Sequence, residues 1–421
     1  MSTTINGYAD EKALEPLPLP ATTPVKRRQE HLSPFVRRLK IFLAFLAAFV
    51  LFDVFTHGPA TTGVSRGCHR IKNHLGDFEQ DGGHQHPFPP IDSWKPYKGT
   101  THFELDPADA AGLTVKGSQA FGKVVFETSK LSDKVVIDLD IKTNKRDKHG
   151  AVSVKEEDGY LTVDTPIRGK LEIYASAKIL IPSNIIGTFG IPAFEVNAPR
   201  HMVDYSDLPE SLEIGEFSVR VAKGFVKPGP VHTNTTTLSI AEGALRGSLT
   251  QARYSTDINV AKGNVTIDIP SISSGAEGTS KVHLGDGYLK GSFAVYNSTN
   301  IDVAKGSIYI SVDFKDAEPR AELTTRIAKG NARVYVNSIA AERLLKASHT
   351  SIAGDQLITY PSNFQGTVDA RGIVGDITLE GKDLSVEKVL GGMVGRKGDS
   401  ERNSVDVKAV KGALDILVGD E

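Results

Sequence analysis

The sequence contains almost no cysteine, and this scarcity limits how the protein can be stabilised. Cys68 is the single cysteine among 421 residues, so no disulfide can form within one chain. Aromatic residues are also few, at 7%. The formal net charge is −2, which provides no basic face of the kind that nucleic-acid binding requires. We therefore expect a fold held by packing and backbone hydrogen bonds, in a protein that does not bind nucleic acid.

Long apolar runs are equally scarce, and residues 34–56 are the exception. Their apolar part, residues 41–55, is interrupted by Asp53. A helix of that length covers about 22 Å, whereas a hydrocarbon core is about 30 Å thick, so the flanking basic side chains must snorkel. We interpret residues 34–56 as a transmembrane signal-anchor helix. A cleaved signal peptide and a buried core helix are the alternatives.

Charges on either side of this segment predict its orientation. Residues 26–40 contain the single acid Glu30 and six basic residues: Lys26, Arg27, Arg28, Arg37, Arg38 and Lys40. The 15 residues after position 55 contain only Arg66 and Arg70 as basic residues. Because cytoplasmic flanks are enriched in Lys and Arg, we expect a type II membrane protein with its N-terminus in the cytoplasm. Its body would lie in the secretory pathway or at the cell surface, and residues 1–33 would be a disordered cytoplasmic tail.

Residues 57–99 are rich in glycine, proline and histidine and are expected to form an exposed stalk. The histidines lack the paired cysteine or the helical His-x3-His spacing of zinc sites, so no metal site and no cofactor is predicted. Cys68 lies in this stalk. In an oxidising lumen it could form an intermolecular disulfide that joins a homodimer, and a free thiol is the alternative.

Val, Ile, Thr and Gly dominate the remainder of the chain, which favours a mainly β protein. Residues 100–212 alternate between apolar and polar positions, with turns such as Asp158-Gly159 between the runs. Short alternating runs of this kind predict an antiparallel, β-sandwich-like segment. Residues 338–348 predict one short helix, through Ala340, Leu344 and Leu345.

Residues 213–421 contain an internal repeat, in which a Val-Ala-Lys-Gly motif alternates with a Gly-x-Leu-x-Gly motif. The marker glycines follow one another at steps of 19, 20, 24, 19 and 24 residues: Gly224, Gly243, Gly263, Gly287, Gly306 and Gly330. A weaker continuation runs through Gly354, Gly375 and Gly412. Positions +2, +4 and +6 after these glycines, and −3 and −5 before them, are mostly apolar. Two strands therefore share one core and meet at a Lys-Gly corner, where glycine can adopt positive φ.

This repeat predicts a β-solenoid. A unit of about 20 residues cannot bury its own apolar face, whereas stacked copies can. The alternative is a β-propeller, because the paired repeat of 43 to 44 residues equals the length of a four-stranded blade. The predicted chain is thus a tail, one transmembrane helix, a stalk, a β-sandwich-like segment and a solenoid.

Three Asn-x-Ser/Thr sequons, at Asn234, Asn264 and Asn297, all follow the predicted span and lie within the repeat. Asn264 is at +1 from Gly263, on the outward parity. Asn234 and Asn297 are each +10 from the preceding marker glycine, which places them at equivalent points of different coils. We expect all three to be N-glycosylated, because glycans at these points would leave the core untouched.

No catalytic residues are predicted. The P-loop, Gly-x-Ser-x-Gly, His-Glu-x-x-His and Rossmann glycine patterns are missing from the sequence. Asp138-Leu139-Asp140 resembles a metal-binding pair, but it lies within an alternating strand and favours a solvated strand face. A glycoside hydrolase or polysaccharide lyase would need carboxylates that converge. The candidate carboxylates in this sequence are scattered: Asp268, Asp302 and Asp313. His283 and His349 are isolated as well.

The repeat units, written Φ-x-Φ-Ala-Lys-Gly-x-Φ-x-Φ-x-Φ, follow an alternating β segment. In this they resemble the adhesin-like β-repeat domains of unknown function found in bacterial and fungal membrane proteins, over residues 103–420. The resemblance implies a β-solenoid with a surface or secretory role, and it carries no catalytic residues.

We therefore expect a non-enzymatic, single-pass type II membrane glycoprotein that displays a β-solenoid ectodomain for adhesion or scaffolding. Its partners would be the bilayer, through one helix, and a glycan or a protein. The alternative is a carbohydrate-active enzyme of the secretory pathway: a glycosyltransferase, a glycoside hydrolase or a polysaccharide lyase.

Overall fold

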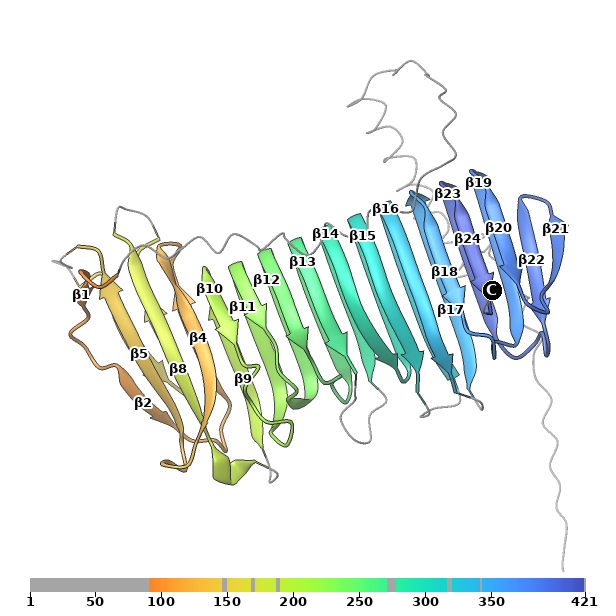
Figure 1. Ribbon diagram of the computed structural model, residues 1–421. Helices are drawn as coiled ribbons and strands as arrows, with labels where there is room; N and C mark the ends of the chain where they lie inside the picture. Colours follow the sequence, from red (N-terminus) through yellow and green to blue (C-terminus); the bar gives the residue numbers. More distant parts are fainter. Residues whose placement is uncertain are drawn as a thin grey trace, which may run out of the picture. The chain divides into compact units, whose positions relative to one another are not determined.

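The computed structural model describes residues 91–145, 150–167, 171–186, 190–270, 278–315, 320–340 and 343–419. All of them belong to the second of the chain's two units, Pro87–Glu421. The described residues form 24 strands joined in one hydrogen-bonded network, with a single turn of 3-10 helix, η1 (Ser183–Ile185). The unit is therefore mainly β, as the composition predicted (Figure 1).

Ten strands make up the first part of the unit, and their pairing is mixed. Their bounds are β1 (Lys95–Pro96), β2 (His102–Leu105), β3 (Ala111–Lys116), β4 (Ala120–Ser129), β5 (Val135–Thr143), β6 (Ser153–Glu157), β7 (Tyr160–Asp164), β8 (Ile173–Pro182), β9 (Ile191–Ala198) and β10 (His201–Asp204). Strand β5 pairs antiparallel with β1, β2 and β8, and β6 pairs antiparallel with β7. Strand β3 instead pairs parallel with β7 and β9, and β4 pairs parallel with β8 and β10.

The prediction of a wholly antiparallel segment over residues 100–212 was therefore wrong for its inner strands. Period-two alternation shows which side chains face the core, but it contains no information on the direction of the neighbouring strand. Parallel pairing of β9 and β10 with β11 then makes this segment continuous with the repeat.

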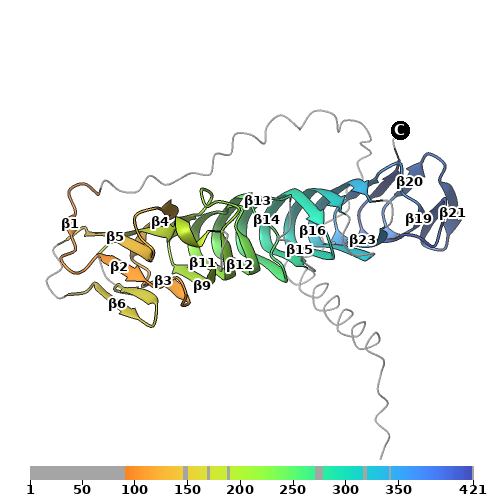
Figure 2. The ribbon, with the colours of Figure 1, turned by 90° about the horizontal axis from the view of Figure 1, so that it is seen from below.

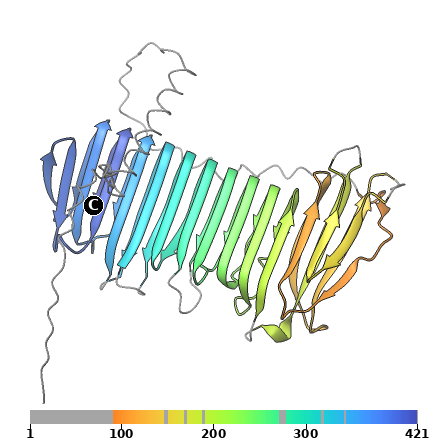
Figure 3. The ribbon, with the colours of Figure 1, turned by 180° about the vertical axis from the view of Figure 1, so that it is seen from behind.

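Six long strands follow, and they are parallel and in register. They are β11 (Glu213–Lys227), β12 (His232–Ser248), β13 (Ser255–Ile269), β14 (Thr279–Val295), β15 (Ser298–Phe314) and β16 (Arg320–Ile339). Each pairs in parallel with the next, so they lie side by side in chain order (Figure 1), and the views from below (Figure 2) and from behind (Figure 3) show the same sequence of strands. Propeller blades are antiparallel, so this pairing is incompatible with the propeller alternative.

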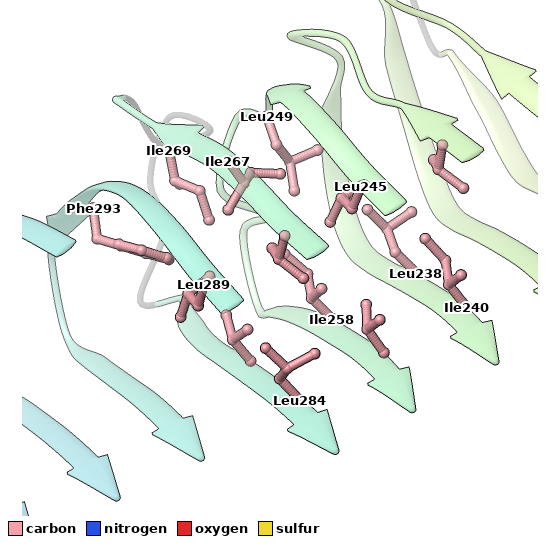
Figure 4. Close-up of a cluster of buried hydrophobic side chains, with 14 of the residues drawn as sticks. Leu238, Ile240, Leu245, Leu249, Ile258, Ile267, Ile269, Leu284, Leu289 and Phe293 are labelled. Carbon is pink, nitrogen blue, oxygen red and sulfur yellow. The ribbon is translucent and has the colours of Figure 1, made fainter. Parts of the chain in front are cut away.

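Each long strand bends at its marker glycine into two arms. We call the residues before the glycine the first arm and those after it the second arm. Apolar side chains of the two arms point into a common interior, as Leu238, Ile258 and Leu284 do from first arms and Leu245, Ile267 and Leu289 from second arms (Figure 4). Each is at most 2% exposed, and burial of one such side chain contributes about 1.5–3 kcal/mol. The predicted inward parity is thus confirmed.

The last part of the unit is not stacked in chain order. Its strands are β17 (Leu344–Ala353), β18 (Gln356–Tyr360), β19 (Gly366–Val374), β20 (Ile377–Gly381), β21 (Ser385–Val389), β22 (Gly392–Lys397), β23 (Ser404–Lys411) and β24 (Leu414–Val418). Strand β23 lies between β17 and β19, and β24 lies between β18 and β20, all parallel. The final strands of the chain are therefore inserted between two earlier coils, and the antiparallel β22 pairs with β19 on its other side.

The short helix predicted for residues 338–348 is wrong. Within this range the described residues end β16 at Ile339 and begin β17 at Leu344. Leu345 and Ala347 are buried whereas Leu344 and Lys346 are exposed, which is the alternation of a strand. The three apolar residues on which the helix was predicted are too few to distinguish the helical from the strand period. Pairing with β16 makes residues 344–348 a strand.

Candidate functional site

The corner glycines form a column in which each backbone lies directly against the next. A Cβ built on Gly287 would stand 1.6 Å from the carbonyl oxygen of Gly263, and one on Gly306 would stand 1.5 Å from that of Gly287. Gly243, Gly263, Gly287, Gly306 and Gly330 all have positive φ, between 130° and 150°. The corner therefore needs glycine for two reasons: the φ that the sequence predicted, and a close approach between coils that it did not reveal.

The column also shows where the repeat deviates. Gly224 is not among the positive-φ residues, although its Cβ would stand 2.0 Å from the His201 carbonyl oxygen. The weaker continuation is real, but its order in space is Gly354, Gly412, Gly375, because Gly412 lies against Gly354 and Gly375 lies against Gly412. The corner lysines are exposed: Lys223, Lys262, Lys305 and Lys329.

In-register pairing arranges the outward side chains in rows with a spacing of about 4.8 Å between strands. On the outward face of the first arms, the first-arm face, opposite charges on neighbouring strands pair with one another. Lys281 lies 3.9 Å from Asp257, and Lys346 lies 3.8 Å from Glu322. Asp302 lies 3.3 Å from both His283 and Arg326. The charges of this face are therefore largely neutralised within the protein.

The outward face of the second arms, the second-arm face, presents aromatic rings and cations instead. On β14, β15 and β16 the register sets three rows of three residues, which we call the tyrosine–cation grid: Tyr288, Ser307 and Asn331; Lys290, Tyr309 and Arg333; Ser292, Ser311 and Tyr335. Tyr288 is 36% exposed and Tyr309 41% exposed. The ring centroids of Tyr309 and Tyr335 are 5.6 Å apart. The three rings therefore follow a diagonal across three neighbouring strands.

The cations of this grid have no acidic partner among the residues that the structure describes. Neither Lys290 nor Arg333 forms an ion pair there, whereas Lys281, Arg326 and Lys346 of the first-arm face do. The neighbouring carboxylates have other donors: Asp268 accepts from the backbone N–H and hydroxyl of Ser292, and Asp313 accepts from the Ser338 hydroxyl at 2.8 Å. The nine residues of the grid thus include two cations and no acid, together with rings and hydroxyls. The carboxylates of Asp268 and Asp313 remain charged at its edge, because neutral donors do not remove their charge.

The scattered carboxylates considered in the sequence do not converge. Asp302 belongs to the first-arm face, while Asp268 and Asp313 belong to the second-arm face. Asp138 and Asp140 of β5 have separate partners: Asp138 accepts from His102 Nδ1 at 2.7 Å, and Asp140 pairs with Lys142 at 3.0 Å. The hydrogen bond to Asp138 raises the pKa of His102. In the described part of the chain, no group of three or more His, Cys, Asp or Glu residues could hold a metal ion.

Two histidines are buried and hold hydrogen-bond networks in the core. His349 contacts the Thr325 hydroxyl through Nδ1 at 2.8 Å and the Tyr360 hydroxyl through Nε2 at 2.9 Å. Burial lowers the pKa of His349 to about 3. His201 contacts the Ala175 carbonyl oxygen through Nε2 at 2.9 Å, and burial lowers its pKa to about 4. Both rings are therefore neutral at physiological pH. His283, in contrast, is exposed on the first-arm face.

The three sequon asparagines lie at the molecular surface of the unit. Asn234 and Asn264 are exposed and Asn297 is half-buried. Strands β12 to β15 are in register, so Asn234 and Asn297 occupy equivalent points three strands apart, about 14 Å from one another. Asn234 lies near the start of β12, and Asn297 directly precedes β15. Asn264 lies on the second-arm face, where its register partner on β14 is Tyr288.

Several predicted features lie outside the described residues: the tail 1–33, the transmembrane segment 34–56 and most of the stalk 57–99, including Cys68. The described residues, which begin at position 91, contain no helix that is long and apolar enough to cross a membrane.

The sequence reasoning missed the tyrosine–cation grid, although a signal for it existed. Aligned on their corner glycines, Tyr288, Tyr309 and Tyr335 fall at positions +1, +3 and +5, all on the outward parity. Only the register of β14, β15 and β16 shows that a shift of two residues per coil makes a diagonal.

Comparisons with known proteins find solved structures of low similarity but no family. No family profile matches the sequence, and no curated protein matches it. One similar solved structure is described as a "putative cell adhesion protein" from Clostridium sporogenes, with 12% identity and a TM-score of 0.19; the match covers 77% of this chain and 100% of that chain.

Two further structures are described as "putative adhesin" proteins. That from Parabacteroides distasonis has 12% identity and a TM-score of 0.35, covering 77% of this chain and 98% of that one. That from Bacteroides fragilis has 9% identity and a TM-score of 0.24, covering 76% and 98%. At such identities and scores these similarities carry no argument about function.

Proposed function

We propose that the protein is a single-pass type II membrane glycoprotein whose β-solenoid ectodomain is displayed for adhesion or scaffolding, without catalysis. In this proposal residues 34–56 anchor the chain with its N-terminus in the cytoplasm. The tail 1–33 stays in the cytoplasm, and the stalk 57–99 carries the ectodomain away from the membrane. The ectodomain then meets a glycan or a protein partner in the secretory pathway or at the cell surface.

The observation that supports the display role is the regular stack of parallel, in-register strands from β11 to β16. Such stacking is typical of solenoids, which present long surfaces of repeated side chains. The arrangement that would favour the enzyme alternative is a set of clustered acids beside exposed aromatics. In the described residues the exposed tyrosines of the second-arm face instead stand beside Lys290 and Arg333.

The type II topology is supported by the charge bias before residue 41 and by the three sequons, which all follow the predicted span. In addition, Asn234 and Asn264 have exposed side chains, so glycans there would point into solvent. Asn297 is half-buried at an equivalent point to Asn234.

Topology is tested by protease protection of the full chain in sealed microsomes, with N-terminal sequencing to detect cleavage. We expect the body to be protected until detergent is added, and the N-terminus to start before the span. A body that is digested without detergent would overturn the type II topology, and an N-terminus after residue 56 would overturn the anchor.

Glycosylation is tested by replacing each sequon asparagine with glutamine. Asn234→Gln is cleaner than Thr236→Ala, because the Thr236 hydroxyl is buried and bonds that of Thr233 at 2.7 Å. We expect each variant to migrate faster than the parent chain by the mass of one glycan, and peptide N-glycosidase to abolish the differences. Identical mobility of all variants before and after digestion would show that these sites are not used.

The homodimer is tested on non-reducing gels with Cys68→Ser as the control. We expect a reducible dimer for the parent chain, and none for the variant.

A further inference from the structure

The tyrosine–cation grid lies on β14, β15 and β16 and contains the exposed Tyr288 and Tyr309 and the half-buried Tyr335. Its three tyrosines are each displaced by one strand and two residues from the next. Strand spacing and rise give a separation of about 8 Å between neighbouring Cα atoms along this diagonal. Exposed aromatic rings in a soluble surface mark an interaction site more often than scattered apolar residues do. The diagonal is therefore a candidate interaction site.

The chemistry of the grid points to a sugar chain. The negatively charged face of an aromatic ring attracts the weakly positive C–H groups that a pyranose presents on its flat side. Around the rings stand side chains that can donate to and accept from hydroxyls, namely Asn331, Ser307 and Ser311. No aliphatic side chain occupies the grid, and protein interfaces usually have an apolar centre. This favours a polysaccharide over a protein.

The charge of the grid adds a second requirement. Lys290 and Arg333 flank Tyr309 in one row, and neither has an ion-pair partner among the described residues. Guanidinium and ammonium groups bind carboxylates and sulfates through charge-assisted hydrogen bonds. On the first-arm face, by contrast, Lys281 and Arg326 already have acidic neighbours. Lys290 and Arg333 are therefore available to pair with an acidic ligand that lies on the tyrosines.

We propose that the tyrosine–cation grid binds a linear acidic polysaccharide. Its rings stack on the sugar faces, and Lys290 and Arg333 pair with the acidic groups. This inference names the ligand class for the display role proposed above and rests on that role. The rows of the second-arm face continue onto β13 and β18, so a chain can extend beyond the grid instead of ending in a pocket.

The test uses the purified full chain in detergent, with immobilised polygalacturonate as the probe. The fully methyl-esterified polymer is the uncharged control, and poly-glutamate is the control for an acidic chain without sugars. Asn264 neighbours Tyr288, so the protein is first treated with peptide N-glycosidase to keep a glycan from covering the grid. We expect binding to polygalacturonate and much weaker binding to both control polymers.

Two grid variants and two controls locate the site. Tyr309→Ala and Lys290→Gln should each weaken binding about tenfold, which corresponds to the loss of one stacking or charge-assisted contact. Lys281→Gln changes a lysine of the same strand on the first-arm face, and Tyr254→Ala removes a ring that is 59% exposed outside the grid. Neither control should change the affinity. All four positions are exposed, and thermal unfolding confirms that each variant is folded.

Each other result overturns the inference. Equal binding of the esterified polymer would show that the charge is irrelevant, and equal binding of poly-glutamate would make the occupant an acidic protein segment. Equal losses of affinity in the grid and control variants would place the binding site elsewhere. If the parent chain does not bind polygalacturonate, the proposed site does not exist. The display role fails separately, through the protease-protection experiment.

Discussion

The two outward faces of the same coils differ in whether their charged side chains form ion pairs with one another. On the first-arm face Asp257, Asp302 and Glu322 each lie within 4 Å of a cation on the neighbouring strand. On the second-arm face Lys290 and Arg333 stand beside exposed tyrosines, with no acidic partner among the described residues. Both faces use the same backbone and the same register. Stacking therefore sets the positions at which side chains repeat. The type of side chain at those positions decides whether the charges of a face pair with one another or are available to a ligand.

The inward sides of the arms differ as well. At the start of the first arms a row of buried hydroxyls runs from strand to strand, from Thr236 to Thr256, Ser280 and Thr299. Further along the stack the first arms contribute the buried pair Thr325 and His349. The second arms of β13 to β16 contribute inward residues that are apolar, such as Ile267 and Ile310. Of these inward groups only the His349 imidazole gains a proton in mild acid when the chain unfolds, so acid should destabilise the first arms more than the second arms.

The largest effect is expected where the two arms meet, because both faces depend on the same bend. Gly287→Ala places a Cβ 1.6 Å from the Gly263 carbonyl oxygen at a φ of 150°. We expect a loss of about 4 kcal/mol or more in the free energy of unfolding, measured by urea denaturation. Polygalacturonate binding should be lost together with the structure.

The matched control for that change is Gly391→Ala. Gly391 also has positive φ, 75°, but an added Cβ would meet no atom within 4 Å. Only the backbone conformation is then unfavourable, at a cost of about 1 kcal/mol. A similar loss for the two variants would show that the close approach between coils is unimportant.

A smaller loss of stability is expected in acid, and it tests the difference between the inward sides of the first and second arms. The pKa of His349 is about 3 in the folded protein and about 6.5 in the unfolded chain. Below pH 6.5 the unfolded state binds a proton at His349 that the folded state does not bind, so the free energy of unfolding falls as the pH falls. Each such histidine should remove about 1.4 kcal/mol per pH unit between pH 6 and pH 4. His201 acts in the same direction.

Urea denaturation at several pH values measures this slope. His349→Gln should reduce the slope by the contribution of one histidine and leave that of His201, whatever the variant's stability at pH 7. An unchanged slope would show that His349 can be protonated in the folded state.

The smallest effect is expected on the first-arm face itself. Asp302→Asn removes the acid that lies 3.3 Å from both His283 and Arg326. Exposed ion pairs contribute about 0–1 kcal/mol and are screened by salt. We expect a loss within that range at low ionic strength and almost none at 1 M salt. Polygalacturonate binding should be unchanged, and an altered affinity would show that the two faces are not independent.

Much of the fold could be predicted from the residues themselves. The period-two parity around each corner glycine identified the buried positions, such as Ile308, Ile310 and Val312. The glycine steps identified the coils. Both are local signals, because an alternating strand has one face for the core, and a corner with positive φ accepts little but glycine.

Less of the candidate site could be predicted. Tyr288, Tyr309 and Tyr335 lie 21 and 26 residues apart in the chain, and their outward parity alone does not say that they are neighbours. The glycine steps suggested the alignment, but only pairing between strands turned it into a surface.

By itself, the sequence determined which side chains face the core, where each coil bends and which residues are outward. The tertiary structure alone decided which strands are neighbours. It placed β23 between β17 and β19, and it made the inner pairs of residues 100–204 parallel. It also made residues 344–348 a strand where a helix had been predicted. The physical reason is that every coil edge offers the same backbone donors and acceptors. Local pattern therefore specifies a strand, whereas packing of the whole unit specifies its partners.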